Sequence, residues 1–111
     1  MNAIKNSVQL IGHVGIDPEF KIFEDGNKIA NLTMATNEIQ KNKNGEKIEK
    51  TDWHRIVARG HVAEIIEKYV TKGKEIAVQG KLTYRNYEDK NGEKRYITEI
   101  FANEILLLGK P

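Results

Sequence analysis

Residues 51–82 read TDWHRIVARGHVAEIIEKYVTKGKEIAVQGKL, and two different hydrophobic periods alternate along them. Apolar and polar residues alternate from Thr51 to Arg59, which predicts a strand with one buried face. The same alternation returns over Glu75–Tyr87 and predicts another strand. Between the two, apolar residues recur at the spacing of one helix face: Val62, Ile65, Ile66, Tyr69 and Val70. This stretch therefore predicts a strand, a helix and a strand in that order.

The end of the predicted helix is marked by Lys72 and Gly73. A lysine in the last turn suits the negative end of the helix dipole, and a following glycine can adopt the left-handed conformation of a helix cap. We therefore expect the helix to end at Gly73.

Upstream of this stretch, the pattern predicts two more strands and a loop. Ile4–Val14 alternates and is followed, after a turn at Asp17-Pro18, by a short continuation at Phe20–Phe23. Lys28–Asn37 alternates again after a tight turn and is expected to be half-buried. Glu38–Lys50 has few apolar residues and is expected to form a long solvated loop.

Downstream, a turn at Asn91-Gly92 precedes a final strand over Arg95–Leu108. The expected fold is all-β with one helix: five strands, with the helix between the third and the fourth. This is the order of an OB-fold, a five-stranded Greek-key barrel that binds oligonucleotides. A chain of 111 residues suits one domain, which we expect over residues 1–108, with a short C-terminal remnant at 109–111.

Composition excludes several classes of protein. Hydrophobic residues make up 39% and charged residues 31%, as in globular domains. Eighteen Lys and Arg against sixteen Asp and Glu give a net charge of +2, so total charge alone does not demand a polyanionic partner. The sequence has no cysteine, and we find neither a signal peptide nor a membrane span. We expect a cytoplasmic protein.

Two predicted strands carry aromatic and cationic residues on one face. Period two places Trp53, Arg55 and Arg59 together, and likewise Lys81, Arg85 and Tyr87. Unpaired bases stack on aromatic rings for about 1–3 kcal/mol each, while Lys and Arg neutralise the phosphates. Lys41 and Lys43 lie in the predicted loop, where polar segments often bind ligands. These faces indicate binding of a single-stranded nucleic acid.

A purely structural interpretation competes with this one at each position. Trp53 could be a core residue, and the alternating cations could form an ordinary solvated face. Tyr69 and Phe101 lie among apolar neighbours, so we expect them in the core. On the strand over Glu75–Tyr87, the apolar face is expected to hold Ile76, Val78, Gly80, Leu82 and Tyr84.

The residues from about Asn6 to Leu107 resemble the bacterial single-stranded DNA-binding protein family. The landmarks are Gly12–Gly15 followed by Asp17-Pro18, Ala30–Thr36, Thr51–Arg55, Ala63-Glu64 leading to Lys72-Gly73, Gly80–Leu82, and Arg95-Tyr96. The resemblance implies an OB-fold that forms a homotetramer and protects single-stranded DNA in replication, recombination and repair, without catalysis.

The resemblance also implies roles for single residues. Trp53 is similar to a stacking residue of the family, Arg55 and Arg85 to phosphate contacts, and Lys21 and Lys72 to parts of the basic path. His54 is similar to a residue at the subunit interface.

Three positions depart from the family pattern. Gln40 and Arg59 stand where familiar members carry aromatic residues, and Tyr87 stands where they often carry Trp. Stacking is therefore expected to be reduced or redistributed. Family members usually continue into a flexible linker and an acidic tip that recruits proteins, whereas this sequence ends at Pro111, so recruitment of partners is not assumed.

The first strand is expected to present an edge that pairs with another copy of the chain, with Ile4, Val8 and Leu10 at the interface. The histidines show no metal-ligand spacing with carboxylates and no phosphate-binding glycine loop opens a helix, so we expect no cofactor, no metal and no enzyme activity. Two alternatives remain open: an OB-fold adaptor of the primosome that acts through protein partners, and an RNA-binding module.

Overall fold

A computed structural model describes residues 3–109 of the chain. Its elements follow one another along the chain as six strands, one α-helix and one short 3-10 helix. Their bounds are η1 (Ala3–Asn6), β1 (Val8–Val14), β2 (Glu19–Ile22), β3 (Lys28–Lys41), β4 (Lys47–Arg59), α1 (Gly60–Tyr69), β5 (Glu75–Glu88) and β6 (Lys94–Leu107).

The strands form one sheet in the order β1-β5-β6-β4-β3-β2, and a pairing between β1 and β3 closes it into a barrel. β2 forms a short hairpin with β3, so the barrel has the five strands that were predicted, and the helix lies between the third and fourth of them. β4 and β6 pair in parallel at Ile56 and Ile100, and the other neighbours pair antiparallel. The predicted OB-fold is confirmed.

Two glycines allow strands to approach each other closely: Gly12 where β1 closes the barrel onto β3, and Gly80 at the register shift between β5 and β6. A Cβ at Gly12 would lie 2.0 Å from the carbonyl oxygen of Ala35, and one at Gly80 would lie 2.0 Å from that of Phe101. Real Cβ atoms never come so close to backbone oxygens, so both positions require a residue without a side chain.

The core lies inside the barrel and under α1. Alternate residues of the strands point inward, and Met34, Ile56 and Ile76 are fully buried. The helix packs its buried Ala63 and Ile66 against β3, β4 and β6, which covers one end of the barrel. Among residues 3–109, no helix is long and apolar enough to cross a membrane.

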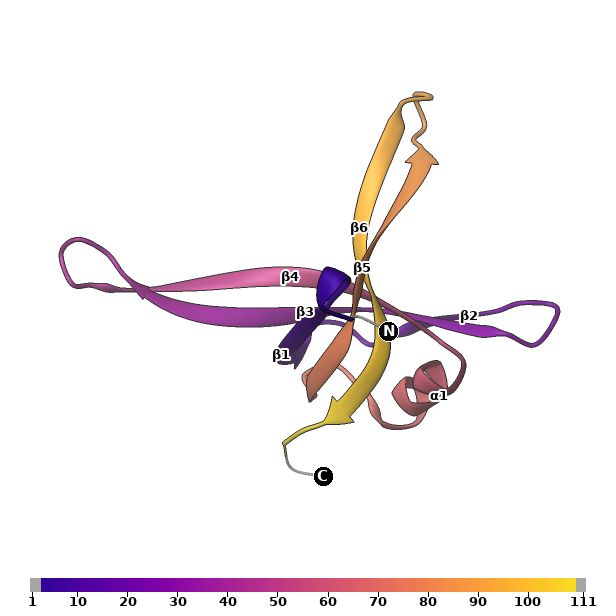
Figure 1. Ribbon diagram of the computed structural model, residues 1–111, viewed down its shortest axis with the longest axis horizontal. Helices are drawn as coiled ribbons and strands as arrows, with labels where there is room; N and C mark the ends of the chain where they lie inside the picture. The colour runs from indigo at the N-terminus through magenta and orange to yellow at the C-terminus, as the bar shows by residue number, and fades with distance from the viewer. Residues whose placement is uncertain (1–2, 110–111) are drawn as a thin grey trace.

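Two long hairpins extend away from the barrel in different directions (Figure 1). One consists of the distal halves of β3 and β4, and the other of the distal halves of β5 and β6. Burial ends along β3 after Thr36, although the paired ladder continues to Lys41. The radius of gyration is 16.2 Å, compared with about 13 Å for a compact chain of this length. We call these two hairpins the β3–β4 arm and the β5–β6 arm.

The β3–β4 arm corrects the prediction of a long loop over Glu38–Lys50. Only residues 42–46 form the turn, because the two strands remain paired up to Lys41 and Lys47. The side chain of Asn42 accepts hydrogen bonds from two backbone N–H groups of the turn. The backbone N–H and C=O groups of a strand pair are satisfied by each other whether the side chains are polar or apolar. A polar sequence therefore does not by itself distinguish a loop from a solvent-exposed hairpin.

The ends of two other elements also differ from the prediction. The first strand begins at Val8, and Ile4 lies in the 3-10 helix that precedes it. α1 ends at Tyr69, so Lys72 and Gly73 belong to the turn beyond it. Gly73 does adopt the left-handed conformation, at φ +89°, but as a turn residue and not as the cap of the helix.

Four side chains expected on buried faces are not buried: Tyr69, Leu82 and Tyr84 are exposed, and Phe101 is partly buried. Tyr69 is 59% exposed on the last turn of α1. Leu82 and Tyr84 share the predicted face of β5, but they lie where this strand leaves the barrel. Of the predicted remnant at 109–111, Lys110 and Pro111 lie outside the described residues.

Candidate nucleic-acid interface

Strand pairing builds one continuous outer surface from β2 to β5. Outward residues of neighbouring strands form rows across the sheet, and one row contains Lys21, Ile29 and Arg59. A second row contains Thr33, Arg55, Glu99 and Thr83, because Arg55 and Glu99 directly precede the parallel pair of β4 and β6. We call this surface, which also includes Trp53, Lys81, Arg85 and Tyr87, the outer face.

Trp53 lies on the outer face and is 63% exposed, so the alternative that it is a core residue is wrong. It pairs with Ala35 of β3, which is almost fully covered. Its six-membered ring lies against Gly15, where an added Cβ would be only 2.2 Å from Cζ3. The indole is therefore seated on small residues while much of its surface remains open to a base.

Arg55 lies beside Trp53 and separates two surface grooves. One groove of about 280 Å³ is lined by Arg55, Asn31, Thr33 and Glu99 together with Ile16 and Glu19. The other, of about 240 Å³, lies where the two arms diverge and is lined by Trp53, His54, Arg55, Leu82, Thr98 and Ile100. Arg55 thus lines both grooves: the first lies on the outer face, and the second is lined mainly by residues of the opposite face of these strands.

The β5–β6 arm extends the outer face with more cations and a further ring. The Lys81 ammonium lies 5.9 Å from the centre of the Phe101 ring, within the range of a cation–π contact. The Arg85 guanidinium donates two hydrogen bonds to Glu99. Tyr87 is 44% exposed. The arm therefore continues the combination of rings and positive charges that begins at Trp53.

The remaining predicted cations are all exposed, but they are more widely spread. Lys21 and Arg59 lie in the same row of the outer face. Lys41 and Lys43 lie at the tip of the β3–β4 arm. Lys72 lies in the turn after α1, where its backbone N–H donates to Asp17. The structure therefore gathers some predicted residues on one surface and places others at its periphery.

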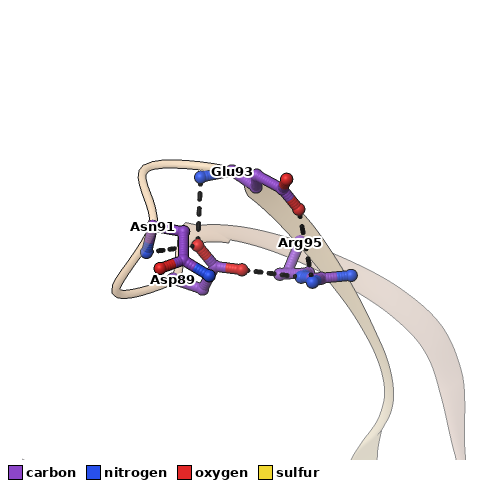
Figure 2. Close-up of polar contacts among 4 residues, drawn as sticks. All are labelled: Asp89, Asn91, Glu93 and Arg95. Atoms are coloured by element: carbon purple, nitrogen blue, oxygen red, sulfur yellow. Dashed lines mark hydrogen bonds and ion pairs between the residues drawn. The ribbon is translucent and has the colours of Figure 1, made fainter.

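Arg95 is a cation of the same arm whose charge is already engaged by acidic residues. Figure 2 shows the turn, in which Asp89 accepts hydrogen bonds from the backbone of Asn91 and Glu93 and from Nε of Arg95. The Arg95 guanidinium, followed by these backbone N–H groups, holds the pKa of the Asp89 carboxyl below its ordinary value. Arg95 also pairs with Glu93, so it contributes less free positive charge than Arg55.

Sequence reasoning missed two features of this region. Glu99 was not singled out, although it is the one buried charged residue among the described residues. Tyr84 and Tyr96 are 70% and 71% exposed on the opposite face of the β5–β6 arm. Strict alternation beyond the barrel could have indicated the tyrosines, but the pattern alone does not show where a strand leaves the core. No cluster of three or more metal-ligating side chains occurs within residues 3–109.

The comparison with known families decides the affiliation. The sequence model described as the Single-strand binding protein family matches residues 5–108, nearly the whole chain. The chain belongs to the single-strand binding protein family. The resemblance stated from the sequence motifs is confirmed.

Curated relatives of this family are similar over most of the chain. The chain is 46% identical over 106 residues to single-stranded DNA-binding protein 1 of Xylella fastidiosa, covering 95% of this chain and 78% of the relative. It is 43% identical over 105 residues to the protein of the same name from Chlorobaculum tepidum, covering 94% of this chain and 65% of the relative. The chain thus spans about two thirds to four fifths of these relatives.

Solved structures of single-strand binding proteins share the fold. A complex of the Plasmodium falciparum SSB with single-stranded DNA superposes with a TM-score of 0.87 at 38% identity, covering 94% of this chain and 95% of that one. A deletion mutant of the single-stranded DNA-binding protein from Thermus aquaticus superposes with a TM-score of 0.82 at 31% identity, covering 94% of this chain and 50% of that one.

The predicted assembly residues of this single-strand binding protein have different positions. Val8 and Leu10 pack against the core, and Ile11 is the apolar residue of β1 that points outward, 63% exposed. Ile4 is exposed on η1. The ring Nε2 of His54 lies 2.9 Å from the Thr36 hydroxyl in a half-buried contact between β3 and β4. Their role at an interface stays a prediction.

Proposed function

We propose that this chain binds single-stranded DNA on the outer face, by stacking bases on Trp53 and neutralising phosphates with Arg55, Arg85 and Lys81. The observation that carries the proposal is the position of Trp53: an exposed indole that rests on Gly15 and lines a groove together with Arg55. Stacking supplies affinity without sequence preference, and the cations balance the backbone charge.

Such binding would coat and protect unpaired DNA during replication, recombination and repair, without chemistry on the DNA. The relatives from Xylella and Chlorobaculum carry the name of single-stranded DNA-binding proteins, which supports this role. We place the activity in the cytoplasm, where a bacterial chromosome lies.

Fluorescence of Trp53 tests the proposal directly, because it is the sole tryptophan of the chain. Oligothymidine should quench its emission, and the logarithm of the binding constant should fall with the logarithm of the salt concentration by about 0.7 per neutralised phosphate. An RNA oligomer and a DNA duplex of the same length serve as competitors. Unchanged emission, or binding that ignores salt, would contradict the proposal, and stronger competition by RNA would favour an RNA-binding module.

We also propose that the chain assembles into a homotetramer. Two features support this. Within residues 3–109, the segment Val8–Ile11 of β1 pairs with β5 and with no other strand, which leaves one edge open, and a groove of about 500 Å³ beside this edge is lined by exposed Ile11 and Leu106. Light scattering at micromolar concentration should give four times the mass of the chain. A monomer under these conditions would contradict the assembly without affecting the test of DNA binding.

A further inference from the structure

Glu99 places a buried negative charge between the cations and rings of the outer face, in a groove that exposed Glu19 also lines. It is only 8% exposed, and it lies in the row between Arg55 of β4 and Thr83 of β5. Glu99 lines the same groove as Arg55. The Thr83 hydroxyl donates to its backbone carbonyl, which ties β6 to β5 at this point.

The carboxylate of Glu99 is held by Arg85. Nε and Nη2 of Arg85 donate to its two oxygens, each at 3.3 Å. Strong hydrogen bonds between charged groups are about 2.7–2.9 Å long, so this pair is loose. The Arg85 side chain is 56% exposed, and the two bonds to Glu99 use only the N–H groups of Nε and Nη2, which leaves Nη1 for another acceptor. A phosphate can therefore reach Arg85 while Glu99 remains nearby.

We infer that Glu99 is a positioning residue that holds Arg85 on the outer face and competes with DNA phosphate for its charge. The inference rests on the proposed function. A phosphate on the free side of Arg85 comes within about 4–6 Å of the carboxylate, where two like charges in water repel enough to weaken binding about three- to fivefold. Glu99 thereby keeps the attachment of DNA at Arg85 weaker than that at Arg55.

The test compares Glu99→Gln with Glu64→Gln, which removes the same charge from an exposed position on α1. Oligothymidine binding is followed by quenching of Trp53 over a series of salt concentrations. Glu99→Gln should bind about three- to fivefold more tightly than Glu64→Gln. Its salt dependence should steepen by up to about 0.7, because the charge of Arg85 is then no longer shared between Glu99 and the phosphate. A merely structural role of Glu99 would not change the salt dependence.

A second comparison keeps the inference testable if Glu99→Gln alone does not fold. Arg85→Gln leaves the carboxylate without its partner and should weaken binding, whereas the double substitution Arg85→Gln with Glu99→Gln removes both charges. The double variant should bind oligothymidine about three- to fivefold more tightly than Arg85→Gln alone. Thermal denaturation establishes that each compared variant is folded.

The outcomes separate the two proposals. If the wild-type chain does not quench with oligothymidine, the proposed function fails and this inference fails with it. If the wild type binds, but Glu99→Gln matches Glu64→Gln or binds more weakly, or the double variant binds no better than Arg85→Gln, only the role of Glu99 is overturned.

Discussion

Substitution of Gly15 by Ala should weaken DNA binding without unfolding the barrel. The added Cβ would lie 2.2 Å from Cζ3 and 2.8 Å from Cη2 of Trp53. Carbon atoms pack at about 3.5–4.0 Å, so the ring must move by roughly 1.3 Å or more. The indole is 63% exposed and can swing outward at little cost in stability. A base stacked on it contributes about 1–3 kcal/mol, so losing the seat should weaken binding about 5- to 150-fold.

Anisotropy of a labelled oligothymidine measures this loss independently of tryptophan emission. Trp53→Ala should show a similar loss, and adding Gly15→Ala to Trp53→Ala should cost almost nothing more, because both substitutions act through the same ring. Circular dichroism and thermal denaturation should show both variants folded. Wild-type affinity for Gly15→Ala, or an equal further loss in the Trp53→Ala background, would refute the argument that Gly15 seats the indole.

Three further results are expected. Gly80→Ala should destabilise the fold by about 1–3 kcal/mol or more, because its Cβ meets the Phe101 carbonyl; an unchanged midpoint in urea would contradict this. Ile66→Ala should cost about 2–5 kcal/mol in thermal denaturation, since this fully buried side chain joins α1 to the core, and a loss near zero would show that the helix does not plug the barrel. NMR titration should give Asp89 a pKa below 3.8 that rises in Arg95→Gln. Because the pKa of Asp89 is lower in the folded state, the ionised carboxylate stabilises the turn fully above pH 3.8, and this stabilisation is lost as the pH falls through the folded-state pKa. An equal Asp89 pKa in the wild type and in Arg95→Gln would exclude Arg95 as the cause of the shift.

The barrel could be predicted from the sequence because its strands and helix carry local patterns. Alternation along Thr51–Arg59 correctly separated buried Ile56 from exposed Trp53 and Arg55. Helical spacing correctly placed Ile66 on the buried side of α1. These patterns arise because one face of each element is buried and the other is exposed to solvent, so apolar and polar residues alternate with the period of the element.

The arms and the fine structure of the outer face could not be predicted in this way. Beyond the barrel both faces of a strand contact solvent, so alternation at Tyr84 does not indicate burial, and the polar sequence around Gln40 predicts a loop although it forms a strand. The contact of Gly15 with Trp53 and the place of Glu99 beside Arg55 depend on which strands become neighbours. Such pairings join residues that are far apart in the chain, and no local pattern encodes them.

The backbone hydrogen bonds of the two arms should open more readily than those of the barrel. An isolated two-stranded hairpin is only marginally stable in water, and the distal β3–β4 and β5–β6 ladders lie outside the core that protects Met34 and Ile76. Their amide protons should therefore exchange with solvent through local fraying, while those of the barrel exchange only when the whole fold opens. A polynucleotide lying along an arm would slow that exchange, and the pattern of newly protected amides would trace its path.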